Sequence, residues 1–451
     1  MELNNVKDTT HAALPQDVDV LIAGAGPTGL ALGVDLARRG IRALIVERQQ
    51  HLSPGTRGSG IQPRTLEVLD DLGVLEAIRA ASDPFPKLAI WDDGRMVGES
   101  QMVEQVEPTP SVPYSSPLMV PQWRQQEILY GRLAELGGTV AFNTELTGFD
   151  QDEEGVRAHL ALPGGGTRTV RAGYLVAADG GRSTVRKALG VEMAGEAVSE
   201  GAAMVADVRI DGLDRQHWHR WGETPNHFMA ILPVSKTDLF QTIAVFESLD
   251  AAPEPTLEAV RETIAARTHL DAGQVREMHW SSVFSPRAAL AGSFRTGRVF
   301  LAGDAAHVHS PAGGQGMNTS VQDAYNLGWK LDLVLRHGAP DALLDTYETE
   351  RRPIAEDILA TSSRLQRSGT LRRGRDLHQL GIGYRDSPLT TEVRTSLPQD
   401  ALRAGDRAPD APCATPTAVR SASSTPTAAR TSRCWSSGTP KCRRSARTWP
   451  A

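Results

Sequence analysis

The chain has 451 residues, of which 40% are hydrophobic, and a formal net charge of −6. This length is enough for two domains with a sizeable core, and the modest negative charge argues against general nucleic-acid binding. Residues 1–16 are polar, so no signal peptide is expected, and no apolar run approaches the ~20 residues of a membrane-spanning helix. All three cysteines follow residue 412, so disulfides cannot hold the main body together. We expect a cytoplasmic enzyme with neither nucleic acid nor a membrane as partner.

A glycine-rich loop follows the first predicted strand, residues 18–23, and opens a predicted helix. This first loop reads Gly24-Ala25-Gly26-Pro27-Thr28-Gly29. A second predicted strand, residues 43–46, ends in Glu47, close to the roughly 20-residue spacing of a carboxylate that binds a ribose. Glycines let the backbone approach a pyrophosphate, and a helix N-terminus favours its negative charge. The unit predicts dinucleotide binding rather than an unliganded turn, but it does not separate FAD from NAD.

Two later apolar strands each lead into a loop that carries an aspartate. Residues 174–178 precede the second loop, which begins Asp179-Gly180, and residues 298–302 precede the third, which begins Gly303-Asp304. Asp179 or Ser183 could also cap the following helix, so the second loop has a structural explanation as well. The third loop ends in Gly314-Gln315-Gly316-Met317-Asn318, which starts a long predicted helix toward residue 334. A helix N-terminus there favours a negatively charged group.

Together, at this spacing, the three loops resemble the FAD-binding fingerprint of class A flavoprotein monooxygenases, the aromatic-hydroxylase group, over residues 17–355. The resemblance implies an α/β fold in which a Rossmann-type FAD-binding domain is interleaved with an antiparallel-sheet substrate domain, as in para-hydroxybenzoate hydroxylase. It is strongest to polycyclic polyketide hydroxylases of antibiotic biosynthesis and to rifampicin-type monooxygenases. The implied FAD-binding domain covers 17–200 and 286–355, and the substrate domain covers 80–120 and 201–285.

The resemblance also assigns site residues. It implies FAD contacts at Gly24, Gly26, Pro27, Thr28, Gly29, Glu47, Arg48, Arg57, Gln122, Leu146, Asp179, Gly180, Gly303, Asp304, Gly314, Gln315, Gly316, Met317 and Asn318. Arg57, on a mobile-flavin loop, and the backbone of Pro311 are expected beside the reacting groups, with a surface salt bridge as the alternative for Arg57. His227, Met229 and Trp280 are candidate substrate-pocket residues, with core packing as the alternative.

The implied activity is hydroxylation of an aromatic, polyketide-type substrate with NADPH and O₂. In the family, NADPH reduces FAD, and O₂ then gives a C4a-hydroperoxide that transfers one oxygen to the ring; the protein positions substrate and excludes water. No metal is expected, because the histidine pairs 217/219 and 307/309 have no carboxylate or cysteine set beside them. Two alternatives remain: a Baeyer–Villiger or epoxidising monooxygenase, and a catalytically impaired FAD-binding protein. The chain is expected to be a monomer or a homodimer.

Composition changes abruptly near the C-terminus. Residues 413–451 contain seven Lys or Arg and no Asp or Glu, whereas residues 1–412 carry −13. Residues 402–410 resemble the entry to a thioredoxin-like C-terminal domain of many family members, but the rest of that domain does not follow. We therefore interpret 356–410 as a helical or linker segment and 411–451 as an atypical disordered tail. A shifted reading frame is favoured over a natural basic tail or a nucleic-acid arm.

Overall fold

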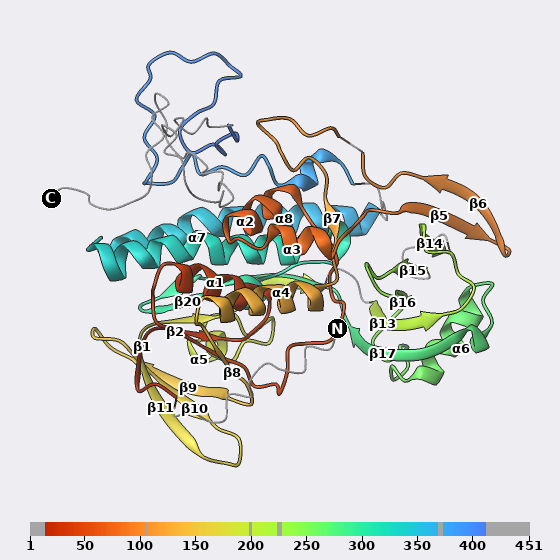
Figure 1. Ribbon diagram of the computed structural model, residues 1–451, viewed down its shortest axis with the longest axis horizontal. Helices are drawn as coiled ribbons and strands as arrows, with labels where there is room; N and C mark the ends of the chain where they lie inside the picture. The colour runs from red at the N-terminus through yellow and green to blue at the C-terminus, as the bar shows by residue number, and fades with distance from the viewer. Residues whose placement is uncertain (1–13, 105, 198–200, 223–227, 369–372, 412–451) are drawn as a thin grey trace, which may run out of the picture.

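The computed structural model describes residues 14–104, 106–197, 201–222, 228–368 and 373–411. Two sheets form the body of the molecule (Figure 1). The eight-stranded sheet and most helices lie on the left of this view, and the seven-stranded sheet lies on the right. The candidate residue His227 and the predicted tail from residue 412 onward lie outside the described residues.

The eight-stranded sheet is built around short apolar strands that run parallel. Its main path has the order β19-β20-β11-β1-β2-β8, and β10 and β9 extend it beside β11. The strands are β1 Asp17–Ala23, β2 Ala43–Val46, β8 Val140–Ala141, β9 Glu145–Gln151, β10 Val156–Ala161, β11 Thr167–Ala177, β19 Arg295–Thr296 and β20 Val299–Leu301. The path from β20 to β8 is parallel at every step. Central strands that are buried on both faces read as continuous apolar runs, which is how the sequence revealed them.

Helices pack against this sheet and against one another. They are α1 Pro27–Arg38, α2 Pro63–Asp71, α3 Leu75–Ala80, α4 Gln122–Glu135, α5 Thr184–Ala188, α7 Gly316–His337 and α8 Asp345–Ser368, with short 3-10 turns η2 Gly303–Ala305, η3 Ala312–Gly314 and η4 Asp341–Leu344. Glycines permit the close approaches. A Cβ on Gly33 would lie 2.6 Å from Cδ1 of Ile45 in β2, and a Cβ on Gly328 of α7 would lie 2.0 Å from Oδ2 of Asp35 in α1.

The seven-stranded sheet combines the two segments expected in the substrate domain. Its order is β17-β13-β16-β15-β14-β5-β6. The strands are β5 Lys87–Asp92, β6 Arg95–Ser100, β13 Ala202–Ile210, β14 His217–Trp221, β15 Met229–Pro233, β16 Leu239–Phe246 and β17 Val275–Phe284, with α6 Leu257–Arg267 and η1 Ala272–Gln274 nearby. Neighbours are antiparallel except β14 and β5, which are parallel. Val260 and Ile264 of α6 pack on one side of this sheet, the α6 face; the opposite side is the site face.

Two three-stranded sheets complete the described strands. One contains β3 Gly60–Ile61, β7 Leu118–Met119 and β4 Asp83–Pro84, and the other contains β12 Met193–Ala197, β18 Arg287–Ala291 and β21 His307–Val308. The strands of the first small sheet are interspersed in the chain with strands of the two large sheets. Ser235, which follows β15 of the substrate sheet, donates to the carbonyl of Met119 in β7 at 2.9 Å. The two large sheets are therefore joined through this small one.

Residues 373–411, which include η5 Arg375–His378, pack on the last two helices. Gln379 Nε2 donates to Gln315 Oε1 at 2.8 Å, and Arg351 Nη1 donates to the Tyr384 hydroxyl at 3.0 Å. Helix α8 continues to Ser368, so the domain boundary predicted at residue 355 falls inside a helix. The segment after this helix belongs to the same packed body.

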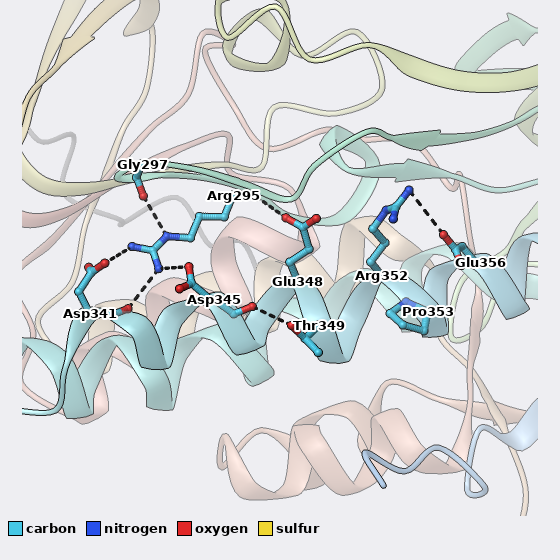
Figure 2. Close-up of a pocket in the computed structure, with 9 residues that line it drawn as sticks. All are labelled: Arg295, Gly297, Asp341, Asp345, Glu348, Thr349, Arg352, Pro353 and Glu356. Atoms are coloured by element: carbon cyan, nitrogen blue, oxygen red, sulfur yellow. Dashed lines mark hydrogen bonds and ion pairs between the residues drawn. The ribbon is translucent and has the colours of Figure 1, made fainter. Parts of the chain in front are cut away.

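A surface hollow of about 620 Å³ lies between β19 and α8 (Figure 2). Its charged groups pair with one another: Arg295 lies 2.5 Å from Asp341 and 2.6 Å from Asp345. Arg295 precedes β20, so the hollow lies at the amino ends of the parallel strands, opposite the loops described below. Within the described ranges, no helix is both long and apolar enough to span a membrane.

Candidate functional site

The three predicted loops meet at one edge of the parallel sheet. They follow β1, β11 and β20, which are consecutive in the sheet, so their carboxyl ends are neighbours. The loops also touch. A Cβ on Gly24 (φ +106°) would lie 2.3 Å from the carbonyl oxygen of Ala178, and a Cβ on Gly303 would lie 2.5 Å from Oγ1 of Thr28. In open parallel sheets, ligands bind outside this carboxyl edge.

Open space remains above two of the glycines. A Cβ on Gly26 or on Gly180 would meet no atom within 4 Å, unlike one on Gly24. Gly180 has a positive φ of +83°, which by itself favours glycine, but Gly26 has neither a packing nor a backbone reason to lack a side chain. A pyrophosphate over the N-terminus of α1 would need the room above Gly26. Pro27 is the first residue of α1, where its missing N–H costs nothing. The residues present fit a dinucleotide cofactor.

Acidic groups flank this space. The Glu47 carboxylate accepts the N–H of Ala25 in the first loop at 2.9 Å. Asp179 Oδ2 accepts the N–H of Thr184 at 2.8 Å and Ser183 caps Arg186 N, so the capping role holds. Asp179 Oδ1 is buried and has no hydrogen-bond partner among the described residues. The second loop thus has one oxygen committed to the helix and one left for a ligand.

Asp304 lies where the first and third loops meet. Its side chain is exposed in the structure. Surrounding protein nevertheless raises the pKa of its carboxyl by desolvation, while His307 and Arg57 lower it. The same interaction brings Arg57, on a loop about 250 residues away in sequence, close to the third loop.

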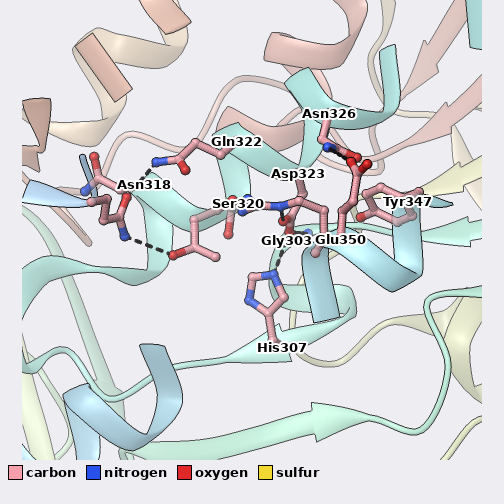
Figure 3. Close-up of polar contacts among 12 residues, drawn as sticks. Gly303, His307, Asn318, Ser320, Gln322, Asp323, Asn326, Tyr347 and Glu350 are labelled. Carbon is pink, nitrogen blue, oxygen red and sulfur yellow. Dashed lines mark hydrogen bonds and ion pairs between the residues drawn. The ribbon is translucent and has the colours of Figure 1, made fainter. Parts of the chain in front are cut away.

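A buried charged cluster holds the third loop in place (Figure 3). Asp323 of α7 accepts from the N–H of Gly303 at 3.1 Å, from His307 at 2.5 Å and from Arg351 at 2.7 Å. Burial raises the pKa of Asp323, but His307 and Arg351 outweigh it and lower the pKa below its usual value. His307 in turn lies 2.8 Å from His309. The ionised carboxylate therefore fixes the backbone beside Asp304.

The start of α7 joins the third loop to residues 55–61, which we call the Arg57 loop. Asn318 accepts the N–H of Gln62 and donates to the carbonyls of Gly60 and Gly314, each at 2.8–2.9 Å. Gln315 is fully buried, and its amide donates to Gly313 and accepts from Gln379. These two amide side chains are used inside the protein, so only the backbone of this turn is left to face a cofactor.

The remaining predicted FAD residues lie around the same edge. The N–H of Gln122 donates to the Gly58 carbonyl at 2.9 Å, and a Cβ on Gly58 would lie 3.9 Å from Sδ of Met317. Leu146 is a buried residue of β9, and the N–H of nearby Thr144 donates to the Glu47 carbonyl at 2.9 Å. Arg48 is exposed. Gln122, Met317 and the Arg57 loop thus lie together, and Leu146 lies near Glu47, at the same edge of the sheet.

Pro311 starts a tight turn before α7. Its carbonyl accepts the N–H of Gly314 at 3.1 Å, and both Gly313 and Gly314 have positive φ. A Cβ on Gly314 would lie 2.9 Å from Nη1 of Arg373. The turn therefore brings the Arg373 guanidinium beside Gly314, three residues after Pro311.

Arg373 was not predicted as a site residue. Its guanidinium lies over the rings of Phe85 (5.3 Å) and Trp218 (5.9 Å). Nε and Nη1 are buried and have no hydrogen-bond partner among the described residues. Burial lowers its pKa to about 10, so it remains charged at neutral pH. In sequence it stands in an arginine-rich run, which ordinarily forms a solvated surface, so no local signal distinguishes it.

The three candidate pocket residues have different positions. Met229 is buried in the cluster on the α6 face, which fits the core-packing alternative. Trp280 of β17 lies beside the Arg57 guanidinium, 5.8 Å from the ring centre. Arg57 has no ion pair within the described ranges, so the salt-bridge alternative gains no support. His227 is not among the described residues.

The histidine pairs considered as metal ligands have other partners. His217 lies 2.7 Å from Asp214 and 2.9 Å from Glu99, and His307 contacts Asp323. In the part of the chain that the structure describes, no three His, Cys, Asp or Glu side chains group as a metal site would require.

Known proteins share both the sequence and this architecture. The FAD binding domain family matches residues 17–362. A flavin-dependent monooxygenase of Mycobacteroides abscessus is 45% identical, over 87% of this chain and 83% of that protein. The 12-dehydrotetracycline 5-monooxygenase/anhydrotetracycline 6-monooxygenase of Streptomyces rimosus is 37% identical, over 76% and 68%. Aklavinone-11 hydroxylase, solved as a ternary complex with FAD and aklavinone, is 32% identical, covers 87% of this chain and 79% of its own, and gives a TM-score of 0.75.

These similarities confirm the predicted fold, a Rossmann-type sheet with an antiparallel substrate sheet, and the predicted family. They agree with the spacing of the three glycine-rich loops and with their convergence at one sheet edge. The chain belongs to the FAD binding domain family and is a flavin-dependent monooxygenase of the class A aromatic-hydroxylase group.

Proposed function

We propose that this enzyme hydroxylates a polycyclic aromatic substrate of the polyketide type, with NADPH as reductant and O₂ as oxygen source. The balance is one ring C–H, O₂, NADPH and a proton giving one C–OH, NADP⁺ and water. Relatives whose names specify tetracycline-type and aklavinone substrates support the class. The observation that carries the proposal is the half-buried Arg373 guanidinium over two aromatic rings beside the Gly314 turn, whose buried Nε and Nη1 have no partner among the described residues.

The residues proposed to hold FAD are those of the carboxyl edge. The first loop and the N-terminus of α1 would bind the pyrophosphate, Glu47 the adenosine ribose, and Asp304 the ribityl hydroxyls. Bound FAD would supply the redox chemistry that passes electrons from NADPH to O₂ and one oxygen atom to the ring. The protein's part is to position the groups, to exclude water and to supply fixed charges.

The proposed substrate space lies between the Gly314 turn and the site face. Phe85, Met119, Trp218 and Leu232 form an apolar cluster there. Flat apolar side chains suit a fused aromatic ring system. Arg373 provides a cation at this wall whose Nε and Nη1 have no hydrogen-bond partner among the described residues, and a phenolate or enolate oxygen would satisfy these N–H groups. An ionised ring oxygen also makes the ring electron-rich, as hydroxylation requires.

The first test is cofactor content and coupled turnover. The purified protein should be yellow and should release free FAD on denaturation. NADPH oxidation should be measured with hydroxylated anthraquinones, naphthacenediones and naphthols, with hydrogen peroxide quantified alongside. Coupled turnover should give a product that carries one atom from labelled dioxygen. If every polycyclic phenol yields only hydrogen peroxide, or if the protein never binds FAD, the proposed function is wrong.

Substitution of two nearby arginines, one at a time, tests whether Arg373 lies beside the bound substrate. Arg373→Ala should raise KM for phenolic substrates by about tenfold or more, because a charge-assisted hydrogen bond contributes roughly 1.5–3 kcal/mol. Arg375→Ala, two residues along, removes an exposed arginine that pairs with Glu104 and should leave KM unchanged. Equal kinetics in the two variants would remove Arg373 from the site.

A further inference from the structure

Three side chains from neighbouring strands form a row across the substrate sheet. In register, Asp207 of β13 is directly opposite Gln241 of β16 on one side and Trp280 of β17 on the other. Directly opposed residues place their side chains on the same face of a sheet. Ala206 and Val208, the neighbours of Asp207, pack on the α6 face, so the row points to the site face.

Asp207 and Gln241 of this row bond to the two backbone polar groups of Thr56, its N–H and its carbonyl. The Thr56 N–H donates to Asp207 Oδ2 at 2.9 Å, and Gln241 Nε2 donates to the Thr56 carbonyl. Thr56 is completely buried. Gly55 lies flat on the indole of Trp280, since a Cβ there would be 2.1 Å from the ring. We call Asp207, Gln241 and Trp280 the Thr56 clamp.

The Thr56 clamp uses a carboxylate to accept a backbone N–H, although a neutral amide oxygen could accept the same hydrogen bond. Asp207 is 1% exposed, and its Oδ1 has no hydrogen-bond partner among the described residues. Burial raises the pKa of this carboxyl to about 6, against the lowering effect of the Thr56 hydrogen bonds. A half-satisfied buried carboxylate is costly. Packing of the sheet alone does not require it.

The two residues that follow the clamped Thr56 lie among the proposed flavin residues. Arg57 follows Thr56 directly, is exposed, and its charge acts on Asp304. The next residue, Gly58, accepts the N–H of Gln122. A shift of Thr56 relative to the substrate sheet would therefore move Arg57 relative to Asp304.

We propose that the Thr56 clamp couples the substrate sheet to the Arg57 loop, with Asp207 and Gln241 as positioning residues that set where Arg57 lies at the flavin. The inference rests on the proposed function, because it assigns the Arg57 loop to the flavin. Substrate that binds against the site face would act on the loop through this row. Substrate would then change the rate of flavin reduction without touching Arg57.

The loop itself is tested without cofactor. Hydrogen–deuterium exchange of the apoprotein should be followed at the Thr56 amide in Asp207→Ala and Gln241→Ala. Exchange in Asp207→Ala should rise by about tenfold or more, because a bond to a charged acceptor is lost, and Asp207→Asn should keep part of the protection since its amide oxygen can still accept. Asp238→Asn is the matched control, because this carboxylate is exposed and pairs with Arg209. Unchanged protection in both clamp variants would refute the clamp.

The coupling is tested in the holoenzyme by stopped-flow reduction with NADPH, with and without a coupled substrate. The ratio of the two rates should fall toward one in Asp207→Ala and Gln241→Ala and stay at the wild-type value in Asp238→Asn. A wild-type ratio in a variant with fast Thr56 exchange would refute the coupling. Absence of NADPH oxidation by the wild-type enzyme would instead overturn the proposed function, since the exchange experiment does not depend on turnover. If Asp207→Ala fails to fold, Gln241→Ala gives the same two measurements.

Discussion

Two glycines of the first loop, changed one at a time to alanine, should separate folding from cofactor binding. Gly24 has φ +106°, and a Cβ there would lie 2.3 Å from the carbonyl oxygen of Ala178. Gly26 has φ −71° and ψ 179°, which alanine adopts freely, and a Cβ there meets nothing within 4 Å. The two substitutions add the same methyl group two residues apart in opposite surroundings.

The expected magnitudes differ accordingly. Gly24→Ala combines a left-handed backbone with an overlap against rigid backbone, so it should lower the free energy of unfolding of the apoprotein by about 2–4 kcal/mol. Gly26→Ala should change it by less than about 1 kcal/mol, and in the stabilising direction, because alanine restricts the unfolded chain. Its methyl group would occupy the space proposed for the pyrophosphate. The overpacking cost of about 1–3 kcal/mol corresponds to roughly 5- to 150-fold weaker FAD binding.

Both quantities can be measured on one preparation. Urea unfolding of the apoprotein gives the free energy of unfolding, and quenching of flavin fluorescence on titration gives the Kd for FAD. The reasoning predicts a stable Gly26→Ala that binds FAD poorly and an unstable Gly24→Ala. Wild-type FAD affinity in Gly26→Ala would refute the proposed pyrophosphate position, and wild-type stability in Gly24→Ala would refute the packing of the first loop on the second.

Three further changes test the site, the pH response and the C-terminus. Asp304→Ala should weaken FAD binding by about 1.5–3 kcal/mol, measured by the same titration, because it removes a charge-assisted acceptor. His219 accepts the indole N–H of Trp91 at 3.1 Å, which requires its neutral form, and burial lowers its pKa. The contribution of His219 to stability is therefore complete above its pKa in the unfolded chain, about 6.5, and is lost as the pH falls below that value. The free energy of unfolding falls there by up to about 1.4 kcal/mol per pH unit, so His219→Gln should make stability less sensitive to acid pH. Truncation after Asp410 should leave Tm unchanged, whereas truncation after Ser368 should lower it, because residues 373–411 bond to α7 and α8.

Each of these has a contrary outcome. Full FAD retention by Asp304→Ala would show that the ribityl hydroxyls do not bind at Asp304. Parallel acid limbs for the wild type and His219→Gln would mean that other groups carry the pH dependence, among them His269, which accepts the Trp221 indole at 3.2 Å. A large fall in Tm on truncation after Asp410 would show that the later residues stabilise the body, contrary to the frameshift interpretation.

The sequence by itself determined the family, the fold class and the strands that carry the three glycine-rich loops. The reason is that a strand, a glycine-rich loop and a helix are consecutive in the chain, so their signal is local. The runs before Gly24, Asp179 and Gly303 were each predicted as buried strands and are β1, β11 and β20. Their apolar composition follows from burial on both faces.

Only the tertiary structure decided which distant residues meet. Strands β5, β6 and β14 were not predicted, and β5 pairs in parallel with a strand about 130 residues later. Met229 faces α6 because its side of the sheet depends on strand register, and a one-residue shift exchanges the two faces. Arg373 reaches the Gly314 turn, and Asp207 reaches Thr56, across 59 and 151 residues of chain. Such contacts exist only after the sheets have packed together, because no local pattern marks which arginine of a charged run, or which aspartate of an apolar strand, will reach the site.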